Sequence, residues 1–237
     1  MRGRFFRPNR TLIRPWYERN AARLTADRDL VAQFCPTLQF RLDKPTGKMA
    51  LEGRILIPEE CGISTEIVTV IRFPGDYPGR EPKAFDANGR FQAWPDRDWR
   101  DRHLRSDGLC CLWLSPRSPW TSTDPFALRH FLDQLTIFFD KQLIYDLTGK
   151  WTGPAYAHER DGFLEFIREE LGGDSILTET LLPAIIMHTT VGPNDGCPCG
   201  QPNKFKKCHL RIVERIQGRI GVETIRANFP RERATPI

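Results

Sequence analysis

The segment 37–73 contains three strand-like runs joined by short connections, and this pattern restricts the possible folds more than any other feature of the sequence. The run 37–43 alternates apolar and polar residues, whereas 49–57 and 64–73 are rich in β-branched and apolar residues. The connecting sequences, KPTGK and EECGIS, contain residues typical of turns. Short links of this kind join antiparallel neighbours, so the pattern predicts an antiparallel meander.

Helices are predicted on both sides of the meander. Residues 15–34 place their apolar side chains on one helical stripe. The Asp-Pro pair at 124–125 is typical of a helix start. The apolar face that follows predicts a long helix, which Gly149 ends. A further helix is predicted at 161–171, and 174–190 fits either a helix or a docking strand. The order of elements predicts an α+β fold with helices beside an antiparallel sheet.

The size and composition of the chain exclude several classes of protein. Its 237 residues, 27.4 kDa, correspond to one or two domains. The content of 40% hydrophobic and 27% charged residues argues against a wholly disordered chain. The longest apolar stretch, 181–187, is far shorter than the about 20 residues of a membrane-spanning helix. Because the first residues also lack the apolar core of a secretory signal, we expect a cytoplasmic protein without a membrane partner.

Positive charge gathers at both ends of the sequence. Residues 1–14 carry five arginines and no acidic residue, and residues 191–237 carry nine Lys or Arg against four Asp or Glu. Each end therefore contributes +5, so the segment 15–190 has a charge of −5 within a total of +5. The basic ends are either solvated tails or weak attractants for nucleic acid, ribosomes or an acidic protein.

The cysteines indicate chemistry or metal binding. An odd number, seven, in a chain without a secretory signal speaks against a disulfide framework. Cys110 and Cys111 are adjacent and lie in the proline-rich, irregular segment 74–122, and long irregular segments inside domains are usually functional. His103 precedes Cys111 by eight residues and could serve as the base for a cysteine nucleophile. The alternative is that both cysteines are small residues of the core.

Two motifs around these cysteines resemble signatures of the ubiquitin-conjugating enzymes. The segment 73–78, FPGDYP, with Pro82 and Phe85, is similar to the F-P-x-x-Y-P…P-x-x-F signature at the end of that family's meander. The segment 108–112, GLCCL, is similar to the family's G-x-I-C-L active-site segment. Trp120 resembles the tryptophan that precedes the family's next helix.

The resemblance covers about residues 15–150, is best to bacterial relatives, and implies transthiolation. It implies that Cys111 accepts a C-terminal acyl group as a thioester from an activating enzyme. Because side chains alternate along an extended segment, we expect Cys110 to point inward. The acyl group would belong to a ubiquitin-like modifier or to the C-terminus of a nucleotide cyclase, and a target protein would receive it. Bacterial relatives are often encoded in anti-phage defence systems, so the resemblance implies such a role as well.

Two histidines are further candidates for the site. The family usually has His-Pro-Asn before its cysteine, and the Asn stabilises the oxyanion, whereas this chain has His103-Leu104-Arg105. His103, Arg105 or a backbone N–H could take that role. His103 could also act as a base or order the loop. Bacterial relatives often have a second histidine after the helix, which suggests His158, although that residue also fits an ordinary surface loop.

The segment 192–209 has the spacing of a metal site. Cys197, Cys199, Cys208 and His209 offer three thiolates and one imidazole within thirteen residues, a set suited to tetrahedral zinc. A unit this small cannot bury a sufficient core and needs a metal to fold. Because four protein ligands close the coordination sphere, the predicted zinc is structural rather than catalytic.

The same segment closely resembles the SEC-C motif, which is found at the C-terminus of the SecA translocation motor and is appended to other bacterial proteins. The match comprises G-x-N-D-x-C-P-C-G followed by K-F-K-K-C-H. The resemblance implies structural zinc and a docking role. The basic residues around it could contact a protein or, without sequence specificity, a nucleic-acid backbone. Phe205 alone offers an aromatic platform, so we do not expect sequence-specific nucleic-acid binding.

Together these observations predict an α+β protein in four parts: a ubiquitin-conjugating-like domain at 15–172, a linker or docking segment at 173–190, a SEC-C zinc module at 191–212 and a basic tail at 213–237. The expected function is that of a ubiquitin-conjugating-like acyl transferase. The alternative is a non-catalytic adaptor that keeps the fold as a scaffold and docks through the zinc module. A redox switch on the vicinal cysteines is the weakest hypothesis, because adjacent cysteines rarely pair without strain.

Overall fold

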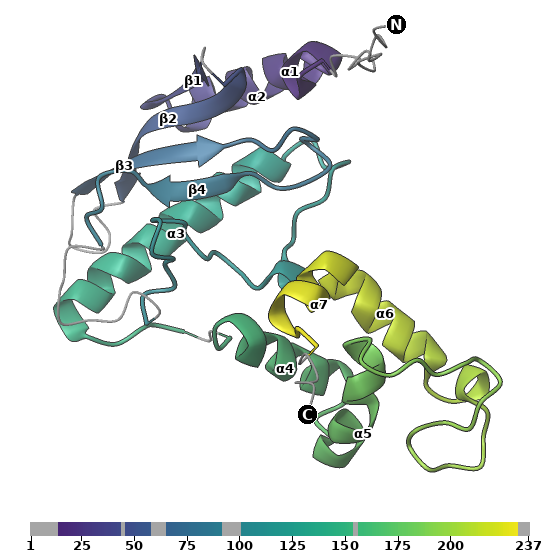
Figure 1. The fold of residues 1–237 in the computed structure, drawn as a ribbon. Coiled ribbons are helices and arrows are strands. Elements are labelled where there is room, and N and C mark those ends of the chain that lie inside the picture. The colour runs from purple at the N-terminus through teal and green to yellow at the C-terminus, as the bar shows by residue number, and fades with distance from the viewer. Residues whose placement is uncertain (1–13, 44–45, 58–64, 92–100, 154–155, 232–237) are drawn as a thin grey trace, which may run out of the picture. The chain divides into compact units, whose positions relative to one another are not determined.

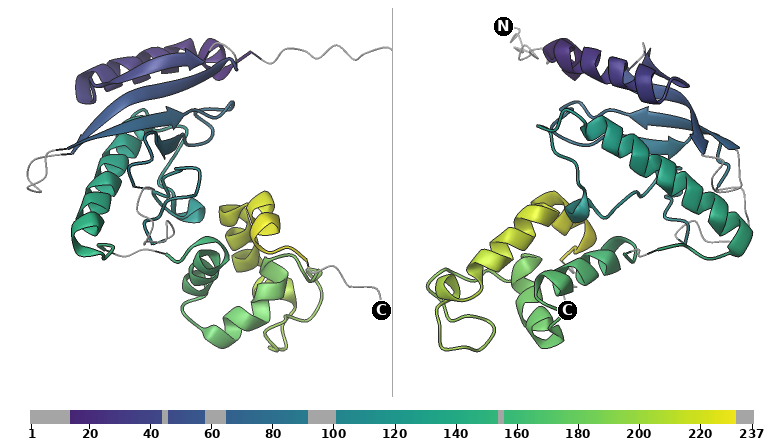
Figure 2. Two further views of the ribbon diagram at one scale, coloured as in Figure 1. Left: turned by 60° about the vertical axis from the view of Figure 1, so that its left-hand side comes forward. Right: turned by 180° about the vertical axis from the view of Figure 1, so that it is seen from behind.

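The computed structural model describes residues 14–43, 46–57, 65–91, 101–153 and 156–231. The chain forms two compact units, the first made of residues 1–112 and 119–152, the second of residues 113–118 and 153–237. The described strands belong to the first unit, and the second is built from helices and loops (Figures 1 and 2). Among the described residues, no helix combines the length and apolar character that a membrane crossing requires.

The first unit is built on a four-stranded antiparallel sheet in the order β1-β2-β3-β4. Its strands are β1 (Leu38–Asp43), β2 (Lys48–Ile57), β3 (Thr65–Arg72) and β4 (Lys83–Asp86). Leu51 of β2 lies opposite both Phe40 of β1 and Ile71 of β3. Because each strand pairs with its neighbour in sequence, the predicted meander is confirmed. The strand β4 is not among the three predicted runs, because four residues are too few to show an alternating pattern.

One long helix covers the sheet. The helices α1 (Trp16–Arg19) and α2 (Ala21–Phe34) precede the strands, and α3 (Ala127–Thr148) contacts β2 and α2 (Figure 1). Leu128, Leu135 and Phe139 of α3 are completely buried, as are Leu51 and Ile71 of the sheet. The core of this unit therefore lies between α3 and the sheet, which confirms the predicted layering of helices beside antiparallel strands.

Side-chain caps set the ends of these helices. The predicted N-terminal helix is divided in two, because the Asn20 side chain accepts a hydrogen bond from the Arg23 backbone N–H at 3.1 Å and begins α2. The long helix begins slightly later than predicted, and the Asp124 side chain accepts from the Phe126 N–H at 2.8 Å. Gly149 ends that helix as predicted, with a left-handed φ of 69°.

The second unit is a helical cluster around its own apolar core. It contains α4 (Glu159–Glu170), α5 (Ser175–Ile185), α6 (Leu210–Ile220) and α7 (Val222–Asn228), with the 3₁₀ turns η2 (Ser115–Arg117) and η3 (Phe205–Lys207). The helix predicted at 161–171 is confirmed as α4, and α5 shows that 174–190 is helical over most of its length. The core is formed by completely buried residues that include Phe166, Ile167, Leu181, Ile185, Ile216 and Ile225.

The segment 213–237, predicted as a basic tail, contains most of α6 and all of α7. Val213, Ile216 and Ile220 are buried on one side of α6, whereas the arginines of the helix are exposed. An amphipathic helix of this kind gains stability by burying its apolar stripe, so α6 packs into the core of the second unit. The limits predicted for the individual domains remain predictions.

Candidate functional site

Four side chains of the second unit meet at one point. The ligand atoms of Cys197, Cys199, Cys208 and His209 all lie within 4.8 Å of one another. The Nδ1 atom of His209 is 3.2 Å from the Sγ atoms of both Cys197 and Cys208, and the Sγ atoms of Cys199 and Cys208 are 3.6 Å apart. Bond lengths of about 2.0–2.3 Å to a tetrahedral ion separate the ligand atoms by about 3.5–3.8 Å. These four residues, all predicted as ligands, could therefore hold a metal ion.

Short-range backbone hydrogen bonds hold the loop that carries these ligands. The Cys197 N–H donates to the Asn203 carbonyl at 3.0 Å, and the Gly200 N–H donates to the Cys197 carbonyl at 3.1 Å. Gly200 has a φ of 79°, a left-handed conformation that favours glycine at this turn. The Cys208 N–H donates to the Phe205 carbonyl at 3.0 Å. The two halves of the ligand set are thus brought together by the local fold.

Phe205 attaches this loop to the helical core. Its side chain is 2% exposed and belongs to the same apolar cluster as Ile216. Its backbone N–H donates to the Asp195 carbonyl at 2.8 Å, and the Asp195 side chain accepts from the Gly192 N–H at 2.7 Å. His209 is the residue directly before α6. The loop that carries the four candidate ligands is therefore continuous with the packed core of the second unit.

In the first unit, Cys111 ends a tight hairpin. The Cys111 N–H donates to the His103 carbonyl at 2.8 Å, and the Arg105 N–H donates to the Leu109 carbonyl at 2.9 Å. The Gly108 N–H closes the turn on the Arg105 carbonyl at 2.9 Å, and Gly108 has a left-handed φ of 82°. Cys111 therefore lies at the end of the hairpin opposite its turn.

The hairpin is bonded to the edge of the sheet. The Cys110 N–H donates to the Ala84 carbonyl at 2.9 Å, and the Asp86 N–H donates to the Gly108 carbonyl at 3.0 Å. Ala84 and Asp86 belong to β4, so the hairpin continues the antiparallel pairing of the meander beyond its last strand. The sheet consequently fixes the backbone on which Cys111 lies.

The two adjacent cysteines differ in exposure. Cys110 is 6% exposed, whereas Cys111 is only partly buried. Burial raises the pKa of Cys110 well above that of a free thiol. Burial also raises the pKa of Cys111, although the positive charge of Arg105 lowers it and the negative charge of Asp107 raises it again. Both thiols are therefore mostly protonated at neutral pH, and Cys111 is the more accessible of the two.

The two candidate histidines have different surroundings. His103 adopts a φ of 51°, and its ring centroid lies 4.6 Å from that of Trp151. Its backbone carbonyl accepts the hydrogen bond from Cys111, and the roles predicted for its imidazole stay predictions. His158 directly precedes α4 and belongs to the second unit. Its predicted place near Cys111 stays a prediction.

Arg102 is a structural residue of this site that the sequence did not reveal. Its side chain is 1% exposed, donates to the Gln142 side chain at 3.2 Å and forms an ion pair with Asp146. The Gln142 side chain in turn donates to the Arg102 carbonyl. The guanidinium also lies 4.9 Å from the ring centroid of Tyr145. These interactions anchor the start of the hairpin to α3, and nothing in a loop sequence marks a single arginine as buried.

Comparisons with models of known protein families, with curated proteins and with solved structures found no match for this chain. Two features of the structure point to a function. One is the group of four residues that could hold a metal ion, and the other is a partly exposed cysteine on a hairpin bonded to the sheet. Cys35, at the end of α2, belongs to neither feature, and Cys61 lies outside the described residues.

Proposed function

We propose that this protein is a ubiquitin-conjugating-like acyl transferase whose C-terminal unit is stabilised by zinc. The observation that carries the proposal is the partly exposed Cys111 on a hairpin bonded to β4. The order of helix, antiparallel strands, Tyr-Pro segment, cysteine, tryptophan and long helix fits the family, and β4 lies between the Tyr-Pro segment and the cysteine. The FPGDYP segment follows β3, and the GLCCL segment lies in the hairpin.

The residues of the proposed signature pack together, which further supports the resemblance. The ring centroid of Tyr77 lies 4.6 Å from that of Trp16, 4.8 Å from that of Phe73 and 5.7 Å from that of Trp120. The Trp120 Nε1–H donates to the Pro78 carbonyl at 2.9 Å. Aromatic packing of this kind holds the segments before and after the hairpin in one cluster, so these side chains support the framework around the cysteine.

In the proposed reaction, the Cys111 thiol gives its proton to solvent, and the resulting thiolate attacks the acyl carbon of a donor thioester on an activating enzyme. A new C–S bond forms, and the donor sulfur leaves as a thiolate. An amine of the target then attacks the acyl carbon, the amide forms, Cys111 leaves as a thiolate, and the amine proton passes to solvent. The Cys111 backbone N–H, one donor that could stabilise the oxyanion, already donates to the His103 carbonyl. Arg105, whose charge favours the Cys111 thiolate, is the best candidate to stabilise developing negative charge.

Zinc is the metal that the donor set of the second unit favours. Three thiolates and one imidazole are soft or borderline ligands, whereas magnesium and calcium select oxygen. Cys197, Cys199, Cys208 and His209 would complete a tetrahedral sphere with no open position, so the ion would stabilise the loop rather than take part in a reaction. The docking role implied by the SEC-C resemblance is part of this proposal.

The second candidate function is a non-catalytic adaptor. Two observations favour it: the pKa of the Cys111 thiol is raised, and His103-Leu104-Arg105 stands where the family usually has its Asn. In this case the first unit would be a scaffold, and the second unit would recruit a partner.

A trapping variant separates the two functions. Cys111→Lys, expressed with an affinity tag in the natural host and purified under denaturing conditions, offers an amine in place of the thiol. The transferase proposal predicts a protein-sized conjugate that resists thiol reagents and is absent from Cys111→Ala. Adding Cys35→Ser to the trapping variant should leave the conjugate unchanged. If the denaturing purification yields no conjugate, and a parallel native purification of Cys111→Lys and Cys111→Ala recovers the same non-covalent partners, the adaptor is favoured.

A further inference from the structure

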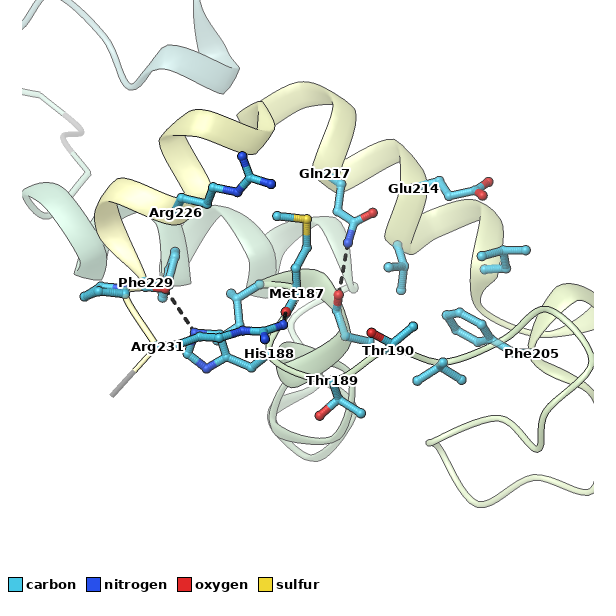
Figure 3. Close-up of a pocket in the computed structure, with 16 residues that line it drawn as sticks. Met187, His188, Thr189, Thr190, Phe205, Glu214, Gln217, Arg226, Phe229 and Arg231 are labelled. Carbon is cyan, nitrogen blue, oxygen red and sulfur yellow. Dashed lines mark hydrogen bonds between the residues drawn. The ribbon is translucent and has the colours of Figure 1, made fainter. Parts of the chain in front are cut away.

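A groove in the second unit belongs to neither of the sites described above. Its volume is about 670 Å³, and it is lined by the residues that follow α5, by one side of α6 and by the segment 226–231 (Figure 3). This volume falls within the roughly 300–1,000 Å³ of pockets that enclose small ligands. It is also large enough for a few residues of an extended peptide.

One end of the groove is cationic. Arg226 and Arg231 lie toward the same end (Figure 3). Arg226 pairs at 2.9 Å with Glu223, and both side chains are largely exposed, so this ion pair contributes little and yields easily to a competing carboxylate. Arg231 donates to the Met187 carbonyl. A guanidinium has five N–H donors, so both arginines keep donors for a ligand.

The other end of the groove is mainly apolar. Phe205 and Val213 are 2% and 3% exposed, and Val191 and Leu210 line the groove beside them. Glu214 is the acidic residue of the lining and lies at this end, away from the two arginines (Figure 3). The groove therefore suits a ligand with an apolar part at one end and an acidic group at the other.

The backbone along one wall can bind an extended chain. Among the described residues, the peptide groups of Thr190 and Val191 make no backbone hydrogen bond, and both residues line the groove. Thr190 and Val191 belong to no strand, but their peptide groups offer the kind of unpaired N–H and C=O groups through which a sheet edge adds an extended peptide. This feature favours a peptide over a compact small molecule.

We propose that this groove binds an extended segment of a partner protein, with an acidic group against Arg226 and Arg231 and an apolar side chain against Phe205 and Val213. The charge of a candidate segment decides whether it fits the groove. Residues 1–14 of a second copy carry five arginines and no acidic residue, so the two arginines of the groove would repel them. An acidic, apolar segment of another protein has the complementary charge. The proposal goes beyond the acyl transfer and needs no reaction at Cys111.

Selection from a displayed library of random heptapeptides, on the full-length zinc-loaded protein, tests this proposal. We expect enrichment of peptides in which an acidic residue lies near an apolar one. The dissociation constant of a recovered, fluorescein-labelled peptide is then measured by fluorescence polarisation. The double variant Arg226→Glu, Arg231→Glu should bind it at least tenfold more weakly, because it replaces two charge-assisted hydrogen bonds by repulsion between carboxylates.

Matched variants make the result specific to the groove. Arg211→Glu changes one exposed charge on α6 outside the groove lining and should leave the affinity almost unchanged. Cys111→Ser should bind the peptide like the natural protein, which separates this proposal from the acyl transfer. If the glutamates disturb folding or zinc content, Arg226→Gln with Arg231→Gln replaces them. The absence of enrichment, or equal affinity of the natural protein and the arginine variants, would overturn the proposal.

Discussion

The two cysteine regions of this protein show how neighbours determine what a thiol can do. In the hairpin, Cys110 and Cys111 are adjacent in sequence but differ in exposure, and burial raises the pKa of both thiols. In the C-terminal loop, three thiols and an imidazole come from separate positions and converge within 4.8 Å. A single accessible thiol suits group transfer, whereas converging thiols suit a metal ion. The surroundings of the same residue type thus suit it to two different purposes.

Removing a metal ligand should have the largest effect. Cys208→Ser is expected to abolish stoichiometric zinc binding and to loosen the second unit around Phe205, since structural zinc in small domains contributes about 10–16 kcal/mol of apparent binding free energy. Elemental analysis should fall from one zinc per chain to almost none. Cys110→Ala, the matched cysteine change in the hairpin, should keep the full zinc content. Equal zinc in both variants would contradict the assignment of the ligands.

Breaking the buried anchor of the hairpin should have the next largest effect. Arg102→Ala leaves Asp146 and Gln142 without their partner and is expected to cost about 3–5 kcal/mol of unfolding free energy. Denaturant unfolding measures this change. Arg129→Ala is the control, because Arg129 and Asp133 form an exposed pair worth about 0–1 kcal/mol. Similar losses of stability in both variants would contradict a special role for Arg102.

The pH dependence of Cys111 alkylation tests its electrostatic environment. Because burial raises the pKa of this thiol, the rate of reaction with iodoacetamide should rise about tenfold for each pH unit and level off only above the ordinary thiol pKa of about 8.5. Peptide mass mapping assigns the modified cysteine. A plateau reached already below pH 8 would show a depressed pKa and contradict the prediction.

The smallest expected effects come from the two charges beside Cys111. Arg105→Ala should raise the pKa of the thiol further and slow alkylation at neutral pH several-fold, whereas Asp107→Asn should lower the pKa and speed the reaction. Because the two substitutions should shift the pKa of Cys111 in opposite directions, each serves as the control for the other. The same rate measurements apply, and shifts in the same direction would exclude a direct electrostatic effect of these residues.

The candidate metal site could be predicted from the sequence because its four residues are close along the chain. Cys197, Cys199, Cys208 and His209 are recognised by type and spacing alone, and the turn at Gly200 needs only local geometry. The hairpin was predictable only in part. Its turn is visible in the sequence, but its bonds to β4 join residues that are far apart, and no local pattern specifies that pairing.

The fold shows the same distinction. The long strands and α3 have clear periodicity, whereas β4 is too short for a pattern to emerge. The basic charge of 213–237 suggests a tail, but Val213, Ile216 and Ile220 recur at helical spacing and could have revealed α6. Asn20 divides the N-terminal helix because a cap competes with helix continuation, a balance that apolar periodicity does not register.

The most direct test of the central claim, that Cys111 carries an acyl group, is the intact mass of the natural protein. The protein is purified from its host without reductant, incubated with a host extract and ATP, and measured under denaturing conditions. We expect a protein-sized adduct that thiol or hydroxylamine releases and that Cys111→Ala abolishes. An adduct that persists in Cys111→Ala, or an unmodified mass throughout, would contradict it.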